Sequence, residues 1–71
     1  MNRVAVVSSN LAAVGYDPVA HTLEVAFKDG SVYQYFDVPS DLHVGLMAAS
    51  SHGKYFEWSI KRAGYRYQQI A

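Results

Sequence analysis

The chain has 71 residues, contains no cysteine and has a formal net charge of zero. This length corresponds to one small domain, and without cysteine neither disulfides nor a thiolate metal site can stabilise it. No apolar run approaches the roughly 20 residues that a membrane helix needs, and residues 1–7 are too short an apolar stretch for a signal peptide, so we expect a cytoplasmic protein. A net charge of zero also argues against strong nonspecific attraction to nucleic acid, because that attraction depends on neutralising phosphates.

The N-terminal part of the chain predicts one β-strand and a turn. Residues 1–7 are interpreted as an N-terminal extension or the start of the first strand, and residues 8–71 as a single domain. The strand spans residues 11–16 and ends at the turn-forming pair Asp17-Pro18. If Tyr16 pairs with His21, Val14 lies on the same face as the next strand's apolar residues. In this register Leu11 lies on the opposite face from Val14, which indicates a bulge or an irregular start near Asn10.

A β-hairpin is predicted around Asp29-Gly30, with strands over residues 21–28 and 31–36. A two-residue Asp-Gly loop between alternating apolar runs is a strong hairpin signal, because both loop residues need positive φ. That loop pairs Phe27 with Val32 and places the aliphatic side chains on the core face. Tyr33 and Tyr35 are then expected to face solvent.

After the hairpin, apolar residues recur at helical rather than strand spacing, and this pattern predicts two short helices. The first begins at Pro39-Ser40-Asp41, with Ser40 as its N-cap. It ends before Gly53, which suits a C-cap or a tight turn. The stripe that we expect to be buried on it consists of Leu42, Gly45, Leu46 and Ala49.

A second helix is expected from about residue 54 to residue 62, with Phe56, Ile60 and Ala63 packing inward. Gly64 ends it, and residues 65–70 alternate enough to form a closing strand. The predicted fold is α+β, in the order βββααβ. It has a three-stranded antiparallel meander and a C-terminal strand, with both helices on one face.

Residues that carry chemistry do not form a catalytic or metal-binding pattern. His21, His43 and His52 have no metal-ligand spacing and are expected on the surface or half-buried, although their joint protonation near pH 6 would move the net charge to about +3. The Ser8-Ser9 and Ser50-Ser51 pairs suit turns and helix caps, because no base and orienting acid accompany them. The sequence therefore predicts a protein that is not an enzyme, with no cofactor and no metal.

The last part of the chain is basic and aromatic. Residues 54–71 contain four basic side chains and one acidic side chain, a net of 4 minus 1, or +3, whereas residues 1–53 have a net of 2 minus 5, or −3. This pattern is typical of a solvated helix face with core aromatics, and it also allows a nucleic-acid patch.

Several segments resemble the KTSC domain, a short domain named for its occurrence at the C-terminus of some lysyl-tRNA synthetases. The resemblance is carried by residues 8–17, by residues 23–30, by Tyr33-Gln34-Tyr35 and by Gly53-Lys54-Tyr55-Phe56 with Ile60. It implies a small bacterial domain that also occurs alone, and RNA binding has been suggested from the synthetase context. Glu57 and the uncharged pair Gln68-Gln69 depart from the pattern expected for RNA binding.

Two binding hypotheses follow. In the first, the tyrosine face binds a protein partner or a second copy of the chain, because tyrosine and tryptophan are favoured at interfaces. In the second, bases of single-stranded RNA or tRNA stack on the tyrosines while basic side chains hold the phosphates. A third interpretation is that the tyrosines only pack against neighbouring segments. The candidate binding residues are Tyr33, Tyr35, Lys28, Lys54, Lys61, Arg62 and Arg66.

Overall fold

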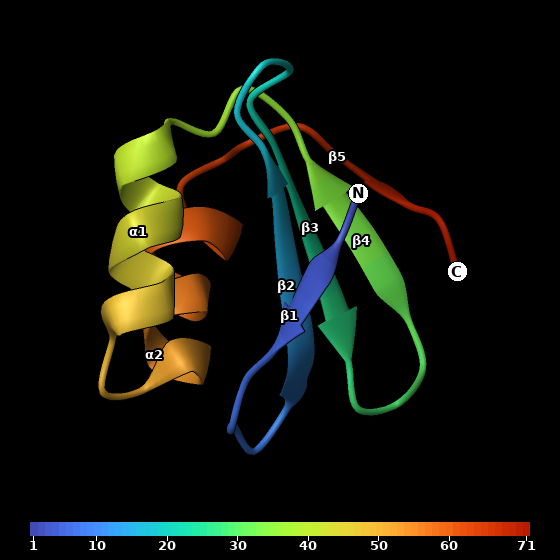
Figure 1. The fold of residues 1–71 in the computed structure, drawn as a ribbon, viewed down its shortest axis with the longest axis vertical. Coiled ribbons are helices and arrows are strands. Elements are labelled where there is room, and N and C mark those ends of the chain that lie inside the picture. The colour runs from blue at the N-terminus through green and yellow to red at the C-terminus, as the bar shows by residue number, and fades with distance from the viewer.

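The computed structural model describes residues 1–71 as one antiparallel sheet with two helices packed together on one of its faces (Figure 1). The molecule measures 27 × 25 × 22 Å. In chain order the elements are β1 (Arg3–Ala5), β2 (Leu11–Asp17), β3 (Thr22–Phe27), β4 (Val32–Tyr35), α1 (Ser40–Ala48), α2 (His52–Phe56), the π-helix η1 (Glu57–Lys61) and β5 (Tyr67–Gln69). None of these helices is long and apolar enough to cross a membrane.

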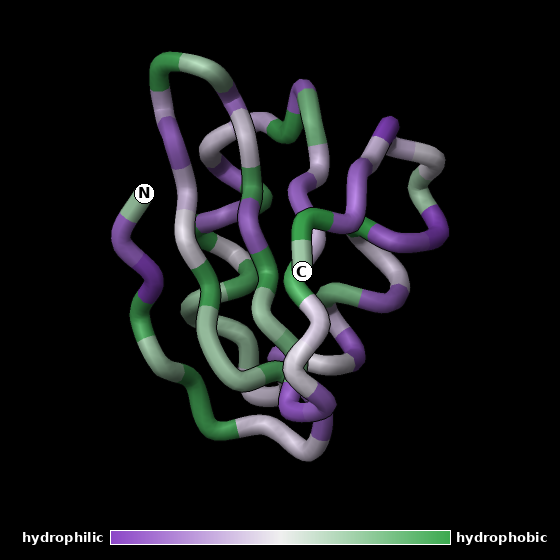
Figure 2. The backbone as a smooth tube through the Cα atoms, turned by 90° about the vertical axis from the view of Figure 1, so that its right-hand side faces the viewer, coloured by the Kyte–Doolittle hydropathy of each residue, from purple (hydrophilic) through white to green (hydrophobic).

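The sheet has the spatial order β1-β2-β3-β4-β5, so four strands form a meander and the fifth joins after the helices. The α+β class is confirmed, and the sheet has one strand more than the sequence analysis predicts. The additional strand is β1, in which Val4 pairs with Val14. All three of its residues are exposed, and the hydrophobic stretch from residue 4 to residue 7 runs along the periphery (Figure 2). An edge strand of this kind has no buried face and therefore no clear alternation in the sequence.

The predicted register of the central hairpin is wrong by one residue. Phe27 N–H donates to Ser31 O at 2.9 Å, and Gly30 N–H donates to Phe27 O at 3.0 Å, so the loop contains three residues rather than two. Gly30 has φ +94°, whereas Asp29 does not have a positive φ. This is a three-residue loop with a left-handed residue at its end, the next most common hairpin connection after the two-residue loop.

The corrected register places both tyrosines on the helix-covered face. Tyr35 pairs with Leu23 and Tyr33 pairs with Val25, so they share a face with these core residues. A shift of one residue moves every side chain of a strand to the other face. The expectation that Tyr33 and Tyr35 face solvent from an open sheet is therefore wrong. Only 5% of Tyr35 is exposed, and Tyr33 is half-buried.

The pairing of β2 with β3 keeps the predicted parity, although it is shifted by two residues. Tyr16 pairs with Leu23 rather than with His21, and Val14 pairs with Val25. The expected bulge is confirmed, because the register changes between Leu11 and Ala13. The bulge turns Leu11 into the core, where it is fully buried.

The helix boundaries differ from the prediction at two caps. The N-cap of α1 is Pro39, and Ser40 is the first helical residue without a capping hydrogen bond. The second helix begins at His52 with Ser51 as its N-cap, whose Oγ accepts from Lys54 N–H at 3.3 Å. Gly53 is therefore inside the first turn of α2 and does not end α1.

The helices cover the core only partly as the apolar stripes predict: of the stripe predicted on α1, Leu46 is buried, whereas Leu42, Gly45 and Ala49 are half-buried. Leu46, Phe56 and Ile60 are buried and pack against the sheet residues, whereas Ala63 lies in the exposed turn that follows η1. Gly64 has φ +88°, consistent with its predicted role at the end of the helix. The remaining members of the buried cluster are Leu11, Val14, Leu23, Val25, Tyr35 and Val38.

Candidate binding pocket

A pocket of about 430 Å³ is bounded by β4, β5 and η1, on the helix-covered side of the sheet. Its volume lies in the range of roughly 300–1,000 Å³ that is typical of ligand sites. Half of the lining side chains are hydrophobic. The lining residues are Asn10, Phe27, Asp29, Ser31, Tyr33, Tyr35, Phe56, Glu57, Lys61 and Tyr67.

Five aromatic rings line this pocket and contact one another. The Tyr33 ring centroid lies 6.4 Å from that of Tyr35 and 6.0 Å from that of Tyr67. Tyr35 and Tyr67 are 5.6 Å apart. Phe27 and Phe56 meet the tyrosines edge-to-face, at 5.8 Å from Tyr33 and 5.5 Å from Tyr35 respectively. Such packing restrains the rings, so the pocket presents a largely preformed aromatic surface.

The phenol of Tyr35 is in an apolar and negatively polarised environment. Burial raises the pKa of Tyr35 to about 12, and the neighbouring Tyr33, Tyr67 and Glu57 contribute in the same direction. Tyr33 differs because its hydroxyl donates to Gln69 Oε1 at 3.2 Å. The structure shows no hydrogen-bond partner for the Tyr35 hydroxyl within the chain.

The polar lining contains two carboxylates and one ammonium group. Asp29 Oδ1 accepts from the backbone N–H of Ser31 at 2.9 Å and from its hydroxyl at 2.6 Å, and these hydrogen bonds lower the pKa of Asp29. Glu57 Oε2 lies 3.8 Å from Lys61 Nζ, and Glu57 Oε1 lies 3.4 Å from Arg62 Nε. These two ion pairs are long and exposed, so each contributes little to stability.

Asn10 connects the pocket to two shallower hollows that adjoin it, because it lines all three. Ser8 fixes this segment: its hydroxyl donates to Asn10 Oδ1 at 3.1 Å, and its oxygen accepts from Leu11 N–H at 3.3 Å. A side chain on Gly53 would place its Cβ 2.7 Å from Asn10 Oδ1. The glycine therefore allows α2 to approach the segment before β2.

The π-helix η1 supplies the charged wall of the pocket. Arg62 N–H donates to Glu57 O at 3.0 Å, an i→i+5 hydrogen bond. Short π-helical turns are rare and are frequently found at functional sites. Here the turn carries Glu57 and Lys61, which both line the pocket.

The structure separates the seven candidate residues into three groups. Tyr33, Tyr35 and Lys61 line the pocket. Lys28 and Lys54 line the adjoining hollows, Lys28 from the hairpin loop rather than from a strand.

The two arginines are engaged elsewhere. Arg62 lies over the Trp58 ring at 4.3 Å. Arg66 precedes β5, 5.1 Å from the Phe36 ring and 3.9 Å from Asp37 Oδ2. Neither arginine lines the pocket or the two hollows.

Sequence reasoning missed most of the pocket. Asn10, Asp29 and Phe27 come from a loop, a turn and a strand end, to which the sequence pattern assigns only structural roles. Tyr67 is brought beside Tyr35 by the pairing of β5 with β4. The resemblance to the KTSC domain was the one signal in the sequence that pointed to these residues. Each of its segments, at residues 8–17, 23–30, 33–35 and 53–56, contributes at least one residue to the lining of the pocket.

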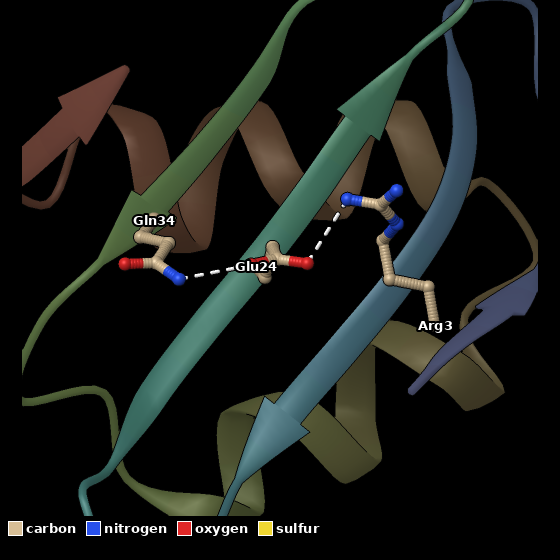
Figure 3. A network of polar contacts seen from close by, with 3 residues as sticks. All are labelled: Arg3, Glu24 and Gln34. Atoms are coloured by element: carbon tan, nitrogen blue, oxygen red, sulfur yellow. Dashed lines mark hydrogen bonds and ion pairs between the residues drawn. The ribbon is translucent and has the colours of Figure 1, made fainter. Parts of the chain in front are cut away.

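The open face of the sheet carries a polar row instead of a binding platform (Figure 3). Arg3 Nη1 donates to Glu24 Oε2 at 3.0 Å, and Gln34 Nε2 donates to Glu24 Oε1 at 2.9 Å. Glu24 is only 7% exposed although no helix covers this face. Gly15 is paired with Arg3 on one side and with Glu24 on the other, and a Cβ on Gly15 would lie 3.0–3.2 Å from Asn2 O, Met1 Sδ and Arg3 Cγ.

Two of the three histidines have side-chain contacts within the fold, and His21 is exposed. The His43 ring stacks on Tyr16 with centroids 4.8 Å apart, and burial lowers the pKa of His43. His52 Nδ1 lies 2.8 Å from Leu46 O. No group of three or more metal-ligating side chains is present.

The fold and the site define a small α+β domain with one aromatic pocket at the edge of a five-stranded sheet. The chain belongs to the KTSC domain family, whose pattern matches residues 7–68. It is 37% identical to the crystal structure of a KTSC domain protein from Yersinia pestis, with a TM-score of 0.91 over 99% of this chain and 97% of that one.

Two relatives show the settings in which similar sequences occur. An uncharacterized protein from Stutzerimonas stutzeri is 43% identical over 70 residues, which is 99% of either chain. A lysine–tRNA ligase from a Nostoc species is 38% identical over 63 residues, which are 89% of this chain and 11% of the ligase. The similarity to the ligase therefore concerns a small part of that enzyme.

Proposed function

We propose that the protein is a non-catalytic binding module that recognises a partner protein by accepting one of its side chains in the aromatic pocket. The observation that carries this proposal is the pocket itself, which is open and lined by five aromatic rings. Aromatic pockets of this kind hold the anchor residues that dominate many protein interfaces. The edge-to-face contacts of the rings keep the site formed without a ligand, which lowers the entropic cost of binding.

The polar groups of the pocket support a binding role rather than catalysis. Asp29 is hydrogen-bonded to Ser31, and Glu57 is paired with Lys61 and Arg62. No histidine lines the pocket, and the only base in contact with the Ser31 hydroxyl is the carboxylate of Asp29, at 2.6 Å. The pKa of Asp29 is lowered, so this carboxylate is a weak base for activating a nucleophile. The pocket can therefore orient and hold a group without transforming it.

RNA is the second candidate partner, and two observations favour it. Relatives named lysine–tRNA ligase contain a similar segment, and Lys28, Lys54 and Lys61 lie around the pocket and its adjoining hollows. In this form a single base enters the aromatic pocket, because the open sheet face carries no tyrosines. Phosphate contacts by the lysines would make the affinity fall as salt rises.

The two candidates can be separated with an immobilised protein and a lysate of its host cells, with and without ribonuclease. A protein partner remains after ribonuclease treatment and is lost from Tyr33→Ala and Tyr67→Ala. The control variant Val19→Ala changes a loop residue that is 93% exposed and outside the pocket lining, and it should keep the partner. Loss of the partner on ribonuclease treatment indicates RNA. Capture that is the same in both tyrosine variants as in the wild type contradicts the proposal that the pocket binds the partner.

A second copy of the chain is one form of protein partner. Sedimentation of the purified protein at micromolar concentrations tests this form directly. A mass of two chains that returns to one in Tyr67→Ala would support it, and a strict monomer excludes it.

A further inference from the structure

We propose that the pocket of this chain selects a cationic side chain, an arginine of the partner polypeptide, with the guanidinium lying among the tyrosine rings beside Glu57. This inference rests on the proposed function, because it specifies which side chain the pocket accepts. Four features of the pocket support it: the charge of the lining, the arrangement of the rings, the pairing of Glu57 within the chain and the position of the lysines.

The pocket lining is negatively charged although the chain is neutral. Its ionisable carboxylates are Asp29 and Glu57, and its only cation is Lys61, so the formal charge is 1 minus 2, or −1. Hydrogen bonds from Ser31 lower the pKa of Asp29 and keep it ionised at neutral pH. Arg62 also pairs with Glu57, but from outside the lining, so the carboxylates of the lining outnumber its one cation and favour a positive group over a phosphate.

The aromatic rings favour the same kind of ligand. The ring centroids of Tyr33, Tyr35 and Tyr67 lie 5.6–6.4 Å from one another, so the rings pack together as one wall, and a cation placed against this wall is within reach of all three π-systems. A guanidinium is planar and stacks on aromatic faces, and its hydrogen-bond donors match a carboxylate. Tyr35 also lines the pocket, and its hydroxyl has no hydrogen-bond partner within the chain, so it supplies a further acceptor.

Glu57 already binds cations, but only loosely. Its partners Lys61 and Arg62 have side chains that are 63% and 57% exposed, at distances of 3.8 and 3.4 Å. Such pairs contribute little, so an incoming guanidinium can replace Lys61 at low cost. The guanidinium of Arg62 also lies over the Trp58 ring, 4.3 Å from its centroid. This contact is an arginine–aromatic pair of the kind that we propose for the pocket.

The positions of the lysines argue against an anionic ligand in the pocket. Lys28 and Lys54 line the adjoining hollows and do not line the pocket. A nucleotide whose phosphate lies within the pocket itself would have that phosphate near Asp29 and Glu57, with Lys61 as the one cation of the lining. Single-stranded RNA sites usually combine stacking rings with a positively charged groove.

The experiment is a titration of the purified protein with three probes, followed by the NMR signals of the tyrosine rings. The probes are N-acetyl-arginine methylamide, the citrulline compound of the same shape without the charge, and adenosine monophosphate. We expect the arginine probe to shift the signals of Tyr33 and Tyr67 at lower concentrations than the citrulline probe or the nucleotide.

Two variants that each remove one charge are expected to change the affinity in opposite directions and so separate a cationic from an anionic ligand. Glu57→Gln is expected to lower the affinity for the arginine probe roughly two- to fivefold, the factor of a partly exposed ion pair. Lys61→Gln removes the competing ammonium and is expected to raise that affinity. For an anionic ligand both signs reverse. Asp29→Asn, which keeps the oxygen that accepts from Ser31, is expected to weaken the arginine probe as Glu57→Gln does.

Several results would overturn this inference. Equal binding of the citrulline and arginine probes removes the cation preference but leaves the binding module intact. Tighter nucleotide binding that weakens in Lys61→Gln assigns the pocket to RNA. The absence of any shift at the tyrosine rings also overturns the inference, and the partner-capture experiment then decides the proposed function independently.

Discussion

At the scale of single residues, two glycines leave space that a side chain would fill. Gly53 leaves room for the side chain of Asn10, and Gly15 leaves room for the backbone oxygen of Asn2 and the side chains of Met1 and Arg3. Neither glycine has a positive φ, so the requirement is space rather than backbone conformation. The same scale includes Tyr35, whose pKa is raised by burial.

Gly53→Ala is expected to destabilise the protein although alanine favours helix. Propensity alone would stabilise α2 by up to about 1 kcal/mol. The new Cβ would lie 2.7 Å from Asn10 Oδ1, and overpacking typically costs about 1–3 kcal/mol. Denaturant unfolding measures the difference. In an Asn10→Ala background the clash is absent, so the same substitution should become neutral or stabilising; an equal loss in both backgrounds would contradict the steric explanation.

Tyr35→Phe is expected to make stability less dependent on pH above pH 10. The folded pKa of Tyr35 is raised from 10.0 to about 12, so the unfolded chain releases this proton first. The stabilisation is fully present below pH 10 and is lost as the pH rises to about 12. Urea unfolding at pH 8 and pH 11 measures the slope. A variant that loses as much stability as the wild type between these values would show that Tyr35 does not contribute.

At the scale of elements, the sequence predicted the existence of the central strands and both helices but not the register of the hairpin. The alternation of apolar residues in β2 and β3 predicted the core face correctly, because Val14, Leu23 and Val25 all lie in the buried cluster. In β4 both faces carry hydrophobic or aromatic residues: Val32 is 8% exposed on one face and Tyr35 5% on the other. With two buried faces, the pattern does not distinguish a two-residue from a three-residue loop.

The candidate site depended on that register and was therefore only partly predictable. Tyr33, Tyr35 and Lys61 were identified, but the placement of the tyrosines on an open face was wrong. Tyr67 joins the site through β5, which pairs with β4 across more than 30 residues of intervening chain. Pairings of this separation depend on tertiary packing and leave no local pattern in the sequence.

Gly30→Val tests the loop geometry. Gly30 has φ +94°, a conformation that costs L-residues roughly 1–2 kcal/mol and β-branched residues most. No atom lies within 4 Å of the position that a Cβ would occupy there, so the loss would come from the backbone alone. Gly30→Asn is the control, because asparagine tolerates this region. We expect a lower melting temperature for the valine variant only, and equal melting temperatures would contradict the positive φ.

At the scale of the whole molecule, one row of side chains links the strands of the open face. Arg3, Gly15, Glu24, Gln34 and Gln68 are paired in register from β1 to β5. The central carboxylate is bound from both sides, by Arg3 and by Gln34. The row therefore ties the exposed edge strand β1 to the middle of the sheet.

Arg3→Met is expected to destabilise the protein by about 1–3 kcal/mol, because it leaves a buried carboxylate without its charged partner. Glu24 is 7% exposed, and the Arg3 side chain is 38% exposed, which places the effect in the lower part of this range. A double-mutant cycle with Glu24→Gln measures the coupling by denaturant unfolding. Additive losses of the two single variants would show that the ion pair does not contribute.

The meander also has a consequence for how the chain assembles. Strands β1 to β4 each pair with the next strand along the chain, so their contacts are local and their loops are short to close. Only β5 is separated from its partner strand by the helices in the chain, and its hydrogen bonds are made with β4 alone. This last strand carries Tyr67, so the amides of β5 should exchange with solvent before those of β3, and the aromatic wall should open and close without unfolding of the sheet.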